Sequence, residues 1–388
     1  MPPGPRGRNA DSMRTDPRTC NDRESHEKHF VGLRRDAVCA LGHAQTPTPA
    51  GAADAAETAG DYLARDFRFS DGSVLPEVRL HYTTLGRLRR DAAGHATNAV
   101  LLLHGTTGSG AQFLTKSSRE ALFAPGAPLD TSKYFVIVPD GLGRGGSSKP
   151  SDGLRARFPQ YGYNDVVQGQ YRLVTEGLKV DHLKLVLGTS MGGMQTWMWG
   201  EQHPAMMDAL MPIASQPIAM AGRNWLWRQM VVGAIEHDPG WQQGDYASSP
   251  RQWIRTMPVF AIMTQNPRQL QLAALDREAA TKLYDSIVAQ YAKYDANDVL
   301  YWFRSSSDYD PAPQLGRIRA KLFAVNFQDD LINATDLGAM QRLVPEVPGG
   351  RFVEIPEGAG SYGHQTLAHP EVWGKYLVQL LDEVGTPR

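Results

Sequence analysis

The sequence contains little cysteine, no excess of charge of either sign and no long hydrophobic run. Only Cys20 and Cys39 occur in 388 residues, which excludes a disulfide scaffold and a cysteine-rich zinc module. Lys and Arg number 40 and Asp and Glu number 41, so the formal net charge is −1, whereas a general nucleic-acid binder carries a basic excess. No apolar run approaches the ~20 residues that span a bilayer. We therefore expect no nucleic-acid or membrane partner, and neither a bound metal nor a bound cofactor.

Residues 1 to 58 have a different composition from the rest of the chain. The first 29 residues mix Pro, Gly, Arg and Asp without a periodic apolar face, and residues 42–60 are mostly small or polar. Neither stretch can bury enough apolar area to offset the entropy of ordering, so we predict a flexible tail over residues 1–58. Both cysteines lie in this tail, and a cysteine nucleophile in the folded part is therefore excluded.

One segment of the tail resembles an export signal. Arg34 and Arg35 precede a short apolar run at residues 37–41. A secretory signal needs ~7–15 apolar residues close to the start of the chain, and this run is shorter and lies far from Met1. We therefore predict a cytoplasmic location, with export to the periplasm as the alternative.

Strand-like runs begin after the tail. They cover residues 78–83, 99–103, 134–138, 183–187, 209–213, 322–326 and 351–355. The first run alternates apolar and polar residues, as expected of a half-exposed edge strand. Several others are continuously apolar between Gly, Pro or Asp, which is typical of strands buried on both faces of a parallel sheet. Helical stretches at residues 165–178 and 192–202 separate strands, so we predict an α/β fold with right-handed crossovers.

The alternation of strands and helices stops between residues 216 and 312. Helix-like segments dominate there, at residues 224–236, 250–264 and 266–303, and five of the eight tryptophans fall within it. We predict a helical lid at residues 216–312, inserted into a catalytic domain made of residues 59–215 and 313–388. The alternative is a helical subdomain whose aromatic residues form an ordinary core.

The pentapeptide Gly-Thr-Ser-Met-Gly at residues 188–192 fits the pattern G-x-S-x-G. It directly follows the apolar run ending at Leu187 and precedes a helix-compatible segment. A strand, a tight turn and a helix in this order predict a nucleophile elbow, which exposes the serine hydroxyl above a helix N-terminus. We predict that Ser190 is a nucleophile; the alternative is a surface serine in a glycine-rich turn.

A serine nucleophile requires a base and a carboxylate, which follow it in this chain order. Asp329 and Asp330 come just after the strand run at residues 322–326, and either could be the acid. His364 lies in a glycine-containing loop after the last strand run. It is a better base candidate than His369, which starts a predicted helix.

An oxyanion site needs backbone amides that point into the active site. One comes from the residue after the nucleophile, which is Met191, and the other from the loop after an early strand. That loop is Leu-His-Gly-Thr-Thr-Gly at residues 103–108. We assign the Thr106 amide as the second donor, with the Gly105 amide as the alternative; Gly105 is also a candidate for substrate binding, and we expect His104 to be structural.

Residues 141–146 match the dinucleotide pattern G-x-G-x-x-G and follow a strand run. A dinucleotide site requires this motif to open a helix. Ser, Lys, Pro and Gly follow here instead and predict a loop. We therefore expect a loop beside the active site and no NAD.

Taken together, these motifs resemble the α/β-hydrolase superfamily, and more closely its homoserine O-acetyltransferase-like branch. The resemblance covers roughly residues 62–385 and rests on the following segments: the loop at 104–108, Phe158-Pro159, Asp165-Val166-Val167 with Gln170, the elbow at 188–195, 234–239, 244–246, Asp329-x-Leu331 and Gly363-His364.

The resemblance implies specific roles. Ser190 would take an acetyl group from acetyl-CoA and pass it to the homoserine hydroxyl, and the family register favours Asp329 over Asp330 as the acid. Arg228, in the first lid helix, looks like the arginine that binds the amino-acid carboxylate; the alternative is a solvated helix face. The resemblance also suggests a homodimer through the lid.

The sequence departs from the branch at Gln365 and Met198, where acidic residues are usual, and in the loop at 141–150, which looks more like that of ordinary esterases. We therefore predict an acyltransferase that uses a small-molecule acyl donor and acceptor. The alternative is a carboxylesterase with the same Ser-His-Asp residues. A catalytically silent binding module is the hypothesis from another class.

Overall fold

The computed structural model describes residues 57–385. The predicted tail therefore lies outside the described residues except for its last two positions, as do both cysteines and the segment that resembles an export signal. Glu57 and Thr58, which the sequence placed in the tail, begin the first strand, β1 (Glu57–Arg68).

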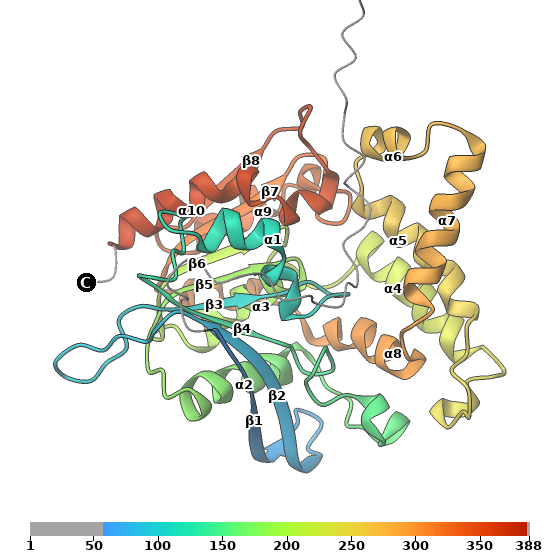
Figure 1. The fold of residues 1–388 in the computed structure, drawn as a ribbon, viewed down its shortest axis with the longest axis horizontal. Helices are drawn as coiled ribbons and strands as arrows, with labels where there is room; N and C mark the ends of the chain where they lie inside the picture. Colours follow the sequence, from blue (N-terminus) through green and yellow to red (C-terminus); the bar gives the residue numbers. More distant parts are fainter. Residues whose placement is uncertain (1–56, 386–388) are drawn as a thin grey trace, which may run out of the picture. The chain divides into compact units, whose positions relative to one another are not determined.

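The centre of the structure is an eight-stranded sheet with the strand order β1-β2-β4-β3-β5-β6-β7-β8. The strands after β1 are β2 (Val74–Leu85), β3 (Ala99–Leu103), β4 (Phe135–Pro139), β5 (Leu183–Thr189), β6 (Met207–Ile213), β7 (Lys321–Phe327) and β8 (Arg351–Ile355). β1 and β2 are antiparallel to their neighbours, and all other pairs are parallel. Each predicted strand run overlaps a strand, and the predicted α/β fold is confirmed (Figure 1).

The position of β2 differs from the prediction, and β1 was not predicted at all. β2 pairs with β1 on one side and with β4 on the other, so the expected edge strand is an inner one. Of the twelve residues of β1, only Ala64 and Phe67 are buried. Such a polar strand carries little of the alternating pattern from which a strand is recognised, and its long pairing with β2 forms it instead.

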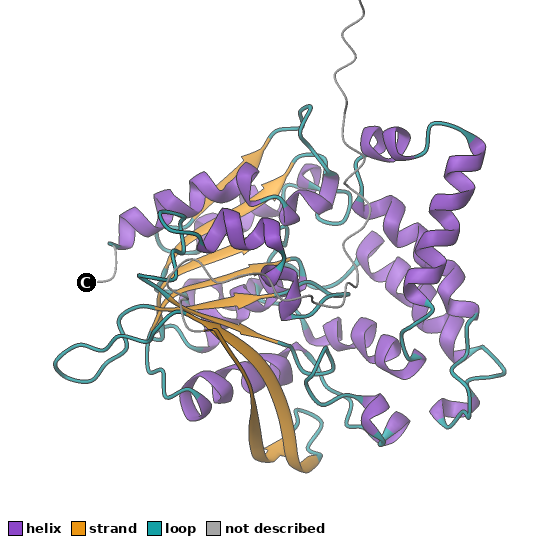
Figure 2. Ribbon diagram, viewed as in Figure 1, coloured by secondary structure: helices purple, strands orange, loops and turns teal. Residues whose placement is uncertain are grey.

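Helices cover both faces of the sheet, and β3 shows how its side chains divide between them. Ala99, Leu101 and Leu103 pack in a core with residues of α2 (Tyr163–Arg172) and α3 (Met191–Gln202). Val100 and Leu102 point to the opposite face and share a core with α10 (Pro370–Val384). Because both faces are buried, the strand is apolar at every position. Figure 2 shows these helices on either side of the sheet.

A group of helices lies between β6 and β7 in the chain, and we call α4–α8 the helical insertion. Its members are α4 (Gly222–Glu236), α5 (Met257–Thr264), α6 (Pro267–Ala273), α7 (Arg277–Tyr291) and α8 (Ala296–Arg304). The predicted segment at 266–303 is divided into three helices. Asn266, Asp276 and Asp295 each accept backbone N–H bonds at the helix starts, and these N-caps fix the breaks.

The helical insertion shares a core with the rest of the described chain. Trp227, Ile235 and Phe303 of the insertion belong to one buried cluster with Leu142 and Phe158 of the sheet domain. The aromatic residues of the insertion thus do form a core, as the alternative interpretation expected. The two remaining helices are short: α1 (Lys116–Ser118) and α9 (Ala339–Leu343).

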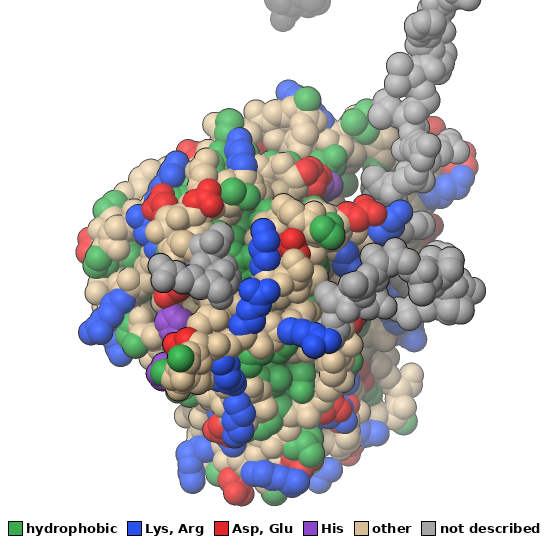
Figure 3. Space-filling model, turned by 60° about the vertical axis from the view of Figure 1, so that its left-hand side comes forward, with side chains coloured by type: hydrophobic (Ala, Val, Ile, Leu, Met, Phe, Trp, Pro, Cys, Tyr) green, Lys and Arg blue, Asp and Glu red, His purple; other side chains and the backbone are tan. Residues whose placement is uncertain are grey.

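One face of the described chain carries side chains of both charges. Figure 3 shows basic and acidic side chains together on one face of the molecule, which agrees with the formal net charge of −1. Among the residues that the structure describes, no helix is both long and apolar enough to cross a membrane.

Candidate active site

The candidate site lies where the carboxyl ends of four parallel strands meet. Ser190 follows β5, the loop containing Gly105 and Thr106 follows β3, Asp330 follows β7 and His364 follows β8. Parallel strands place all their carboxyl ends at one edge of a sheet, so residues far apart in the chain come together there.

Ser190 has the strained backbone that a nucleophile elbow requires. Its φ is 55° and its ψ is −115°, a conformation that costs a non-glycine residue about 1–3 kcal/mol. The neighbouring glycines allow β5, α3 and β3 to approach each other closely. A Cβ on Gly188 would lie 2.1 Å from the carbonyl oxygen of Gly192, and a Cβ on Gly192 would lie 2.0 Å from that of Leu103. The predicted elbow is therefore present.

A continuous set of hydrogen bonds joins Ser190, His364 and Asp330. The Ser190 Oγ lies 2.9 Å from His364 Nε2, and His364 Nδ1 lies 2.7 Å from Asp330 Oδ2. A carboxylate can only accept, so Asp330 holds the imidazole in the tautomer with its proton on Nδ1. His364 Nε2 is then free to accept the serine proton. The Asp330 and His364 side chains are only 0% and 5% exposed, which shields this pair from water.

The position of Asp330 corrects the prediction that Asp329 is the acid. Asp329 Oδ2 instead accepts hydrogen bonds from Gly363 N–H at 2.8 Å and from the Asn266 side chain at 2.7 Å. Asp330 Oδ1 accepts two backbone N–H groups, from Ile332 and Asn333, at 2.8 and 3.0 Å. The turn after β7 thus directs the second of the two carboxylates towards His364. The first one ties the histidine loop to the start of α6.

In the loop after β3, the amide of Gly105 is already hydrogen-bonded within the described chain, whereas that of Thr106 is not. Gly105 N–H donates to Gln112 Oε1 at 3.0 Å, while Gln112 Nε2 donates to Thr189 Oγ1 at 2.7 Å. Within residues 57–385, no acceptor is bonded to the N–H of Thr106 or of Met191. In the part of the chain that the structure describes, the amides of Thr106 and Met191 are therefore free to donate to a bound group, whereas the Gly105 amide is already engaged. Gln112, which the sequence analysis did not identify, ties this loop to the elbow.

His104 is buried and structural. Gly141 N–H donates to His104 Nε2 at 2.9 Å, so the ring proton is on Nδ1, which donates to the Gly105 carbonyl at 2.8 Å. Burial lowers the pKa of His104 to about 4. The ring is thus neutral at pH 7 and connects the β3 loop with the β4 loop, as the sequence predicted.

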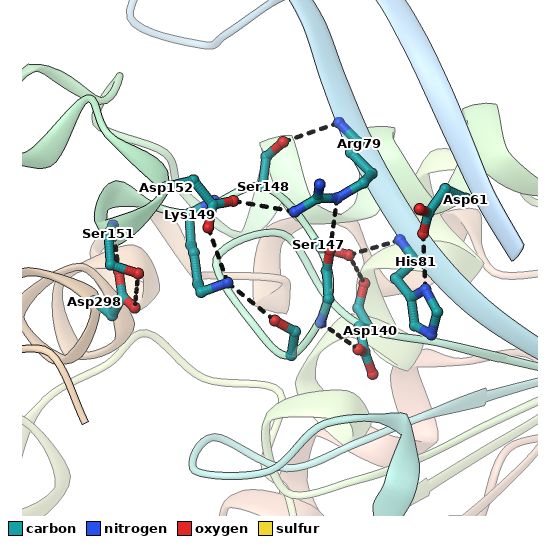
Figure 4. A network of polar contacts seen from close by, with 12 residues as sticks. Asp61, Arg79, His81, Asp140, Ser147, Ser148, Lys149, Ser151, Asp152 and Asp298 are labelled. Carbon is teal, nitrogen blue, oxygen red and sulfur yellow. Dashed lines mark hydrogen bonds and ion pairs between the residues drawn. The ribbon is translucent and has the colours of Figure 1, made fainter. Parts of the chain in front are cut away.

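The glycine-rich motif at residues 141–146 forms a loop, as predicted, and no helix follows it directly. Its neighbour Asp140 receives N–H bonds from Gly110 and Gly146 at 2.7 and 2.8 Å. Ser147 Oγ donates to the Asp140 carbonyl and accepts from His81 N–H (Figure 4). The loop is therefore fixed to β2 and to the loop after β3.

Arg228 lies in α4 and is only 2% exposed, so it is not on a solvated helix face. Its Nε donates to Asn224 Oδ1 at 3.1 Å, and its guanidinium carbon lies 4.8 Å from the centre of the Trp227 ring. Burial lowers its pKa, and the neighbouring Tyr163 side chain raises the pKa in part. No partner within the described chain lies in hydrogen-bonding geometry to Nη1. A buried donor of this kind can bind an anion.

The comparisons with known proteins agree with this geometry. A homoserine O-acetyltransferase of Thermobifida fusca (strain YX) is 35% identical over 202 residues, which cover 48% of this chain and 52% of that protein. A homoserine O-acetyltransferase of Pasteurella multocida (strain Pm70) is 28% identical over 341 residues, covering 78% and 91%. The solved structure of the acetyl esterase MekB matches with a TM-score of 0.72 and 24% identity, over 83% of this chain and 97% of that one.

These relatives share one fold with the present chain. The sequence matches the family described as alpha/beta hydrolase fold over residues 98–364, a range that includes both Ser190 and His364. In three dimensions, the match corresponds to the order of the strands, the strained backbone of Ser190 and the position of His364 after the last strand. The chain belongs to the α/β-hydrolase fold family.

Proposed function

We propose that the protein is a serine-dependent acyltransferase with Ser190, His364 and Asp330 as its catalytic triad. The observation that carries this proposal is the hydrogen-bonded series from Ser190 Oγ through the imidazole to a buried carboxylate, with the serine held at a strained φ of 55°. Nucleophile, base and orienting acid in this arrangement support acyl transfer.

The proposed mechanism has two halves. Ser190 Oγ attacks the carbonyl carbon of the acyl donor while His364 Nε2 takes its proton, and the Thr106 and Met191 amides stabilise the oxyanion. The leaving group departs with the proton that His364 returns. A hydroxyl acceptor then gives its proton to His364 and attacks the acyl carbon. The bond from this carbon to Ser190 Oγ breaks, and His364 returns the proton to Ser190. Acyl-CoA is the donor that the resemblance to homoserine acetyltransferases suggests.

Arg228 would hold the carboxylate of the acceptor. Its burial and its free Nη1 support this role, since a guanidinium hydrogen-bonds strongly to a carboxylate. Gln365, in the position that is usually acidic, would bind an ammonium group more weakly than a carboxylate does. The acceptor is thus proposed to be a hydroxy acid or hydroxy-amino acid, without commitment to homoserine.

A carboxylesterase is the second candidate function, because water can replace the hydroxyl acceptor at the same acyl-enzyme. The loop at residues 141–150, which resembles that of ordinary esterases, favours this alternative. The two functions differ in whether the site excludes water while it admits the acceptor.

We also propose that the helical insertion, within residues 216–312, acts as a lid and contributes to a homodimer. Burial raises the pKa of Tyr291 to about 12, and the side chain of Thr107, in the loop after β3, lowers it in part; this supports a position of the end of α7 beside that loop. Apolar side chains on α4, α5 and α6 are exposed, including Leu226 at 71% and Leu272 at 67%. A sedimentation measurement on the Leu226→Glu variant tests the dimer.

The function is tested with the purified protein and its Ser190→Ala variant. Each is incubated with acetyl-CoA plus a panel of hydroxy acids and hydroxy-amino acids, and separately with short-chain aryl esters. CoA release that requires an acceptor supports the transferase, whereas ester hydrolysis without acceptor dependence supports the esterase. Exposed Ser117 supplies the control Ser117→Ala. Full activity of Ser190→Ala in both assays would refute the proposed mechanism.

A further inference from the structure

A second buried arginine, Arg144, lies in the loop after β4. It is 2% exposed, and its hydrogen-bond contacts are long: Nη1 is 3.4 Å from the Gly143 carbonyl oxygen and Nη2 is 3.7 Å from Met191 Sδ. Burial lowers its pKa, and the Tyr161 side chain raises the pKa in part. Its Nε has no hydrogen-bond partner within the described residues. No ion pair joins it to a carboxylate of residues 57–385. The acid that acts on it electrostatically, Asp298, has both oxygens bonded to Ser151.

Arg144 and Arg228 lie against adjacent aromatic residues of α8, since their guanidinium carbons are over the rings of Trp302 and Phe303, respectively. Burial raises the pKa of the Tyr163 hydroxyl, and the positive charges of Arg228 and Arg144 each lower it in part. Each also stacks on an indole ring of the helical insertion, with Arg144 4.5 Å from the centre of the Trp302 ring. Two cations are thus buried near one tyrosine, and this hydroxyl has no hydrogen-bond partner in the described chain either.

The place of Arg144 connects this region with the reacting serine. Its Nη2 contacts the side chain of Met191, the residue that follows Ser190 and whose amide is a proposed oxyanion donor. A group bound by Arg144 would therefore lie close to the acyl group on Ser190.

The loop that carries Arg144 is held rigidly. Arg79 Nε donates to the Gly146 carbonyl at 2.8 Å, and Arg79 N–H donates to Ser148 Oγ at 2.9 Å (Figure 4). Gly145 has a φ of 48°, and a Cβ there would lie 2.0 Å from Asp140 Oδ2. Trp302 Nε1 donates to the Gly143 carbonyl at 2.7 Å and joins the loop to α8. The side chain of Arg144 thus projects from a backbone that is fixed on both sides.

Burying a guanidinium without a counter-ion is unfavourable, and an apolar side chain of similar size would pack there at lower cost. An anion bound by these two buried groups would offset this cost. We propose that Arg144, together with Arg228, forms an anion-binding pocket that selects substrates bearing a carboxylate group. The claim that the pocket selects carboxylate-bearing substrates rests on the proposed acyl-serine function. The claim that the pocket binds an anion does not depend on that function.

Binding is measured first, without turnover. In the Ser190→Ala background, calorimetric titration and thermal melts are recorded with sodium succinate, sodium butyrate and sodium chloride at matched ionic strength. We expect saturable binding of a carboxylate and a raised melting temperature. Arg144→Met and Arg144→Gln should each weaken binding about tenfold or more, Arg144→Lys should weaken it less, and exposed Arg277→Gln should leave it unchanged.

The melting temperature without ligand separates binding from a structural role. If the arginine is kept for a ligand, Arg144→Met should melt at the same or a higher temperature than its parent. The proposal is refuted if neither carboxylate binds saturably, or if Arg144→Gln binds as tightly as the parent. Arg144→Gln and Arg144→Lys decide the question if Arg144→Met does not fold.

Turnover then identifies which substrate carries the carboxylate. With Ser190 present, an aryl half-ester of succinate is compared with an aryl butyrate, and hydroxy acids are compared with simple alcohols as acceptors. A loss of kcat/KM in Arg144→Gln that is confined to the half-ester places the carboxylate on the acyl chain. A loss confined to hydroxy acids places it on the acceptor, and equal losses for charged and neutral substrates contradict the pocket. Carboxylate binding by a protein inactive in every assay would refute the proposed function but not the pocket.

Discussion

Replacing each of two adjacent carboxylates by its amide tests the proposed triad. Asp330 Oδ2 faces His364 Nδ1 at 2.7 Å, and Oδ1 accepts N–H bonds from Ile332 and Asn333. In Asp330→Asn, an amide nitrogen at the Oδ2 position would donate to Nδ1 and move the ring proton to Nε2, which could no longer accept from Ser190. In the opposite orientation, the amide N–H groups would face the backbone N–H groups of Ile332 and Asn333, which are themselves donors.

Both orientations of the amide therefore impair the base, and the expected loss in kcat is about 10⁴-fold, or about 5 kcal/mol of transition-state stabilisation. Asp329→Asn behaves differently. Its remaining carbonyl oxygen can still accept from Gly363 N–H and the Asn266 side chain, so only the charge-assisted part of two hydrogen bonds is lost. That change should cost about 1–2 kcal/mol of stability and less than about tenfold in kcat.

The assay is steady-state turnover of an aryl acetate, and of acetyl-CoA with the best acceptor, together with thermal melts of every variant. Exposed Asp336 supplies the control Asp336→Asn, which should match the parent in both measurements. The reasoning fails if Asp330→Asn keeps more than a tenth of the parental kcat while folded, or if Asp329→Asn loses as much activity as Asp330→Asn.

Three further predictions concern the supports of the site and a buried acid. Gln112→Leu frees the Gly105 amide and loosens the oxyanion loop, so kcat should fall about 10- to 100-fold with little change in KM, as single-turnover kinetics can check. Burial raises the pKa of Glu201 to about 8, so folding stability should fall as pH rises from about 4.5 to about 8. Glu201→Gln should therefore raise the melting temperature more at pH 8 than at pH 5, and equal shifts at the two pH values would contradict this. Gly192→Ala places a Cβ 2.0 Å from the Leu103 carbonyl oxygen, so denaturant titrations should show a loss of about 3 kcal/mol or more in the free energy of unfolding. A variant of parental stability would show that the elbow can relax.

Much of the fold was predictable because its inner strands are buried on both faces. Their continuous apolar runs, separated by helical stretches, identify a parallel sheet before any coordinates are known, and β3 to β8 overlap the predicted runs. β1 escaped prediction because its sequence is polar and it forms by pairing with β2. The sequence predicts one helical segment at 266–303, whereas the structure divides it into three helices, because the caps Asp276 and Asp295 lie within an otherwise helical composition.

The local sequence predicted the elbow at Ser190 and the histidine that meets it, His364, because a strand, a tight turn and a helix impose backbone constraints that few sequences satisfy. It also pointed to the amides of Thr106 and Met191, which have no acceptor within residues 57–385. The choice between Asp329 and Asp330 depends on tertiary packing instead. Neighbouring residues in a turn point in different directions, and which one meets the histidine depends on how two distant loops pack. The burial of two unpaired arginines is likewise a property of packing, since an arginine in a sequence carries no sign of whether water or aromatic rings surround it.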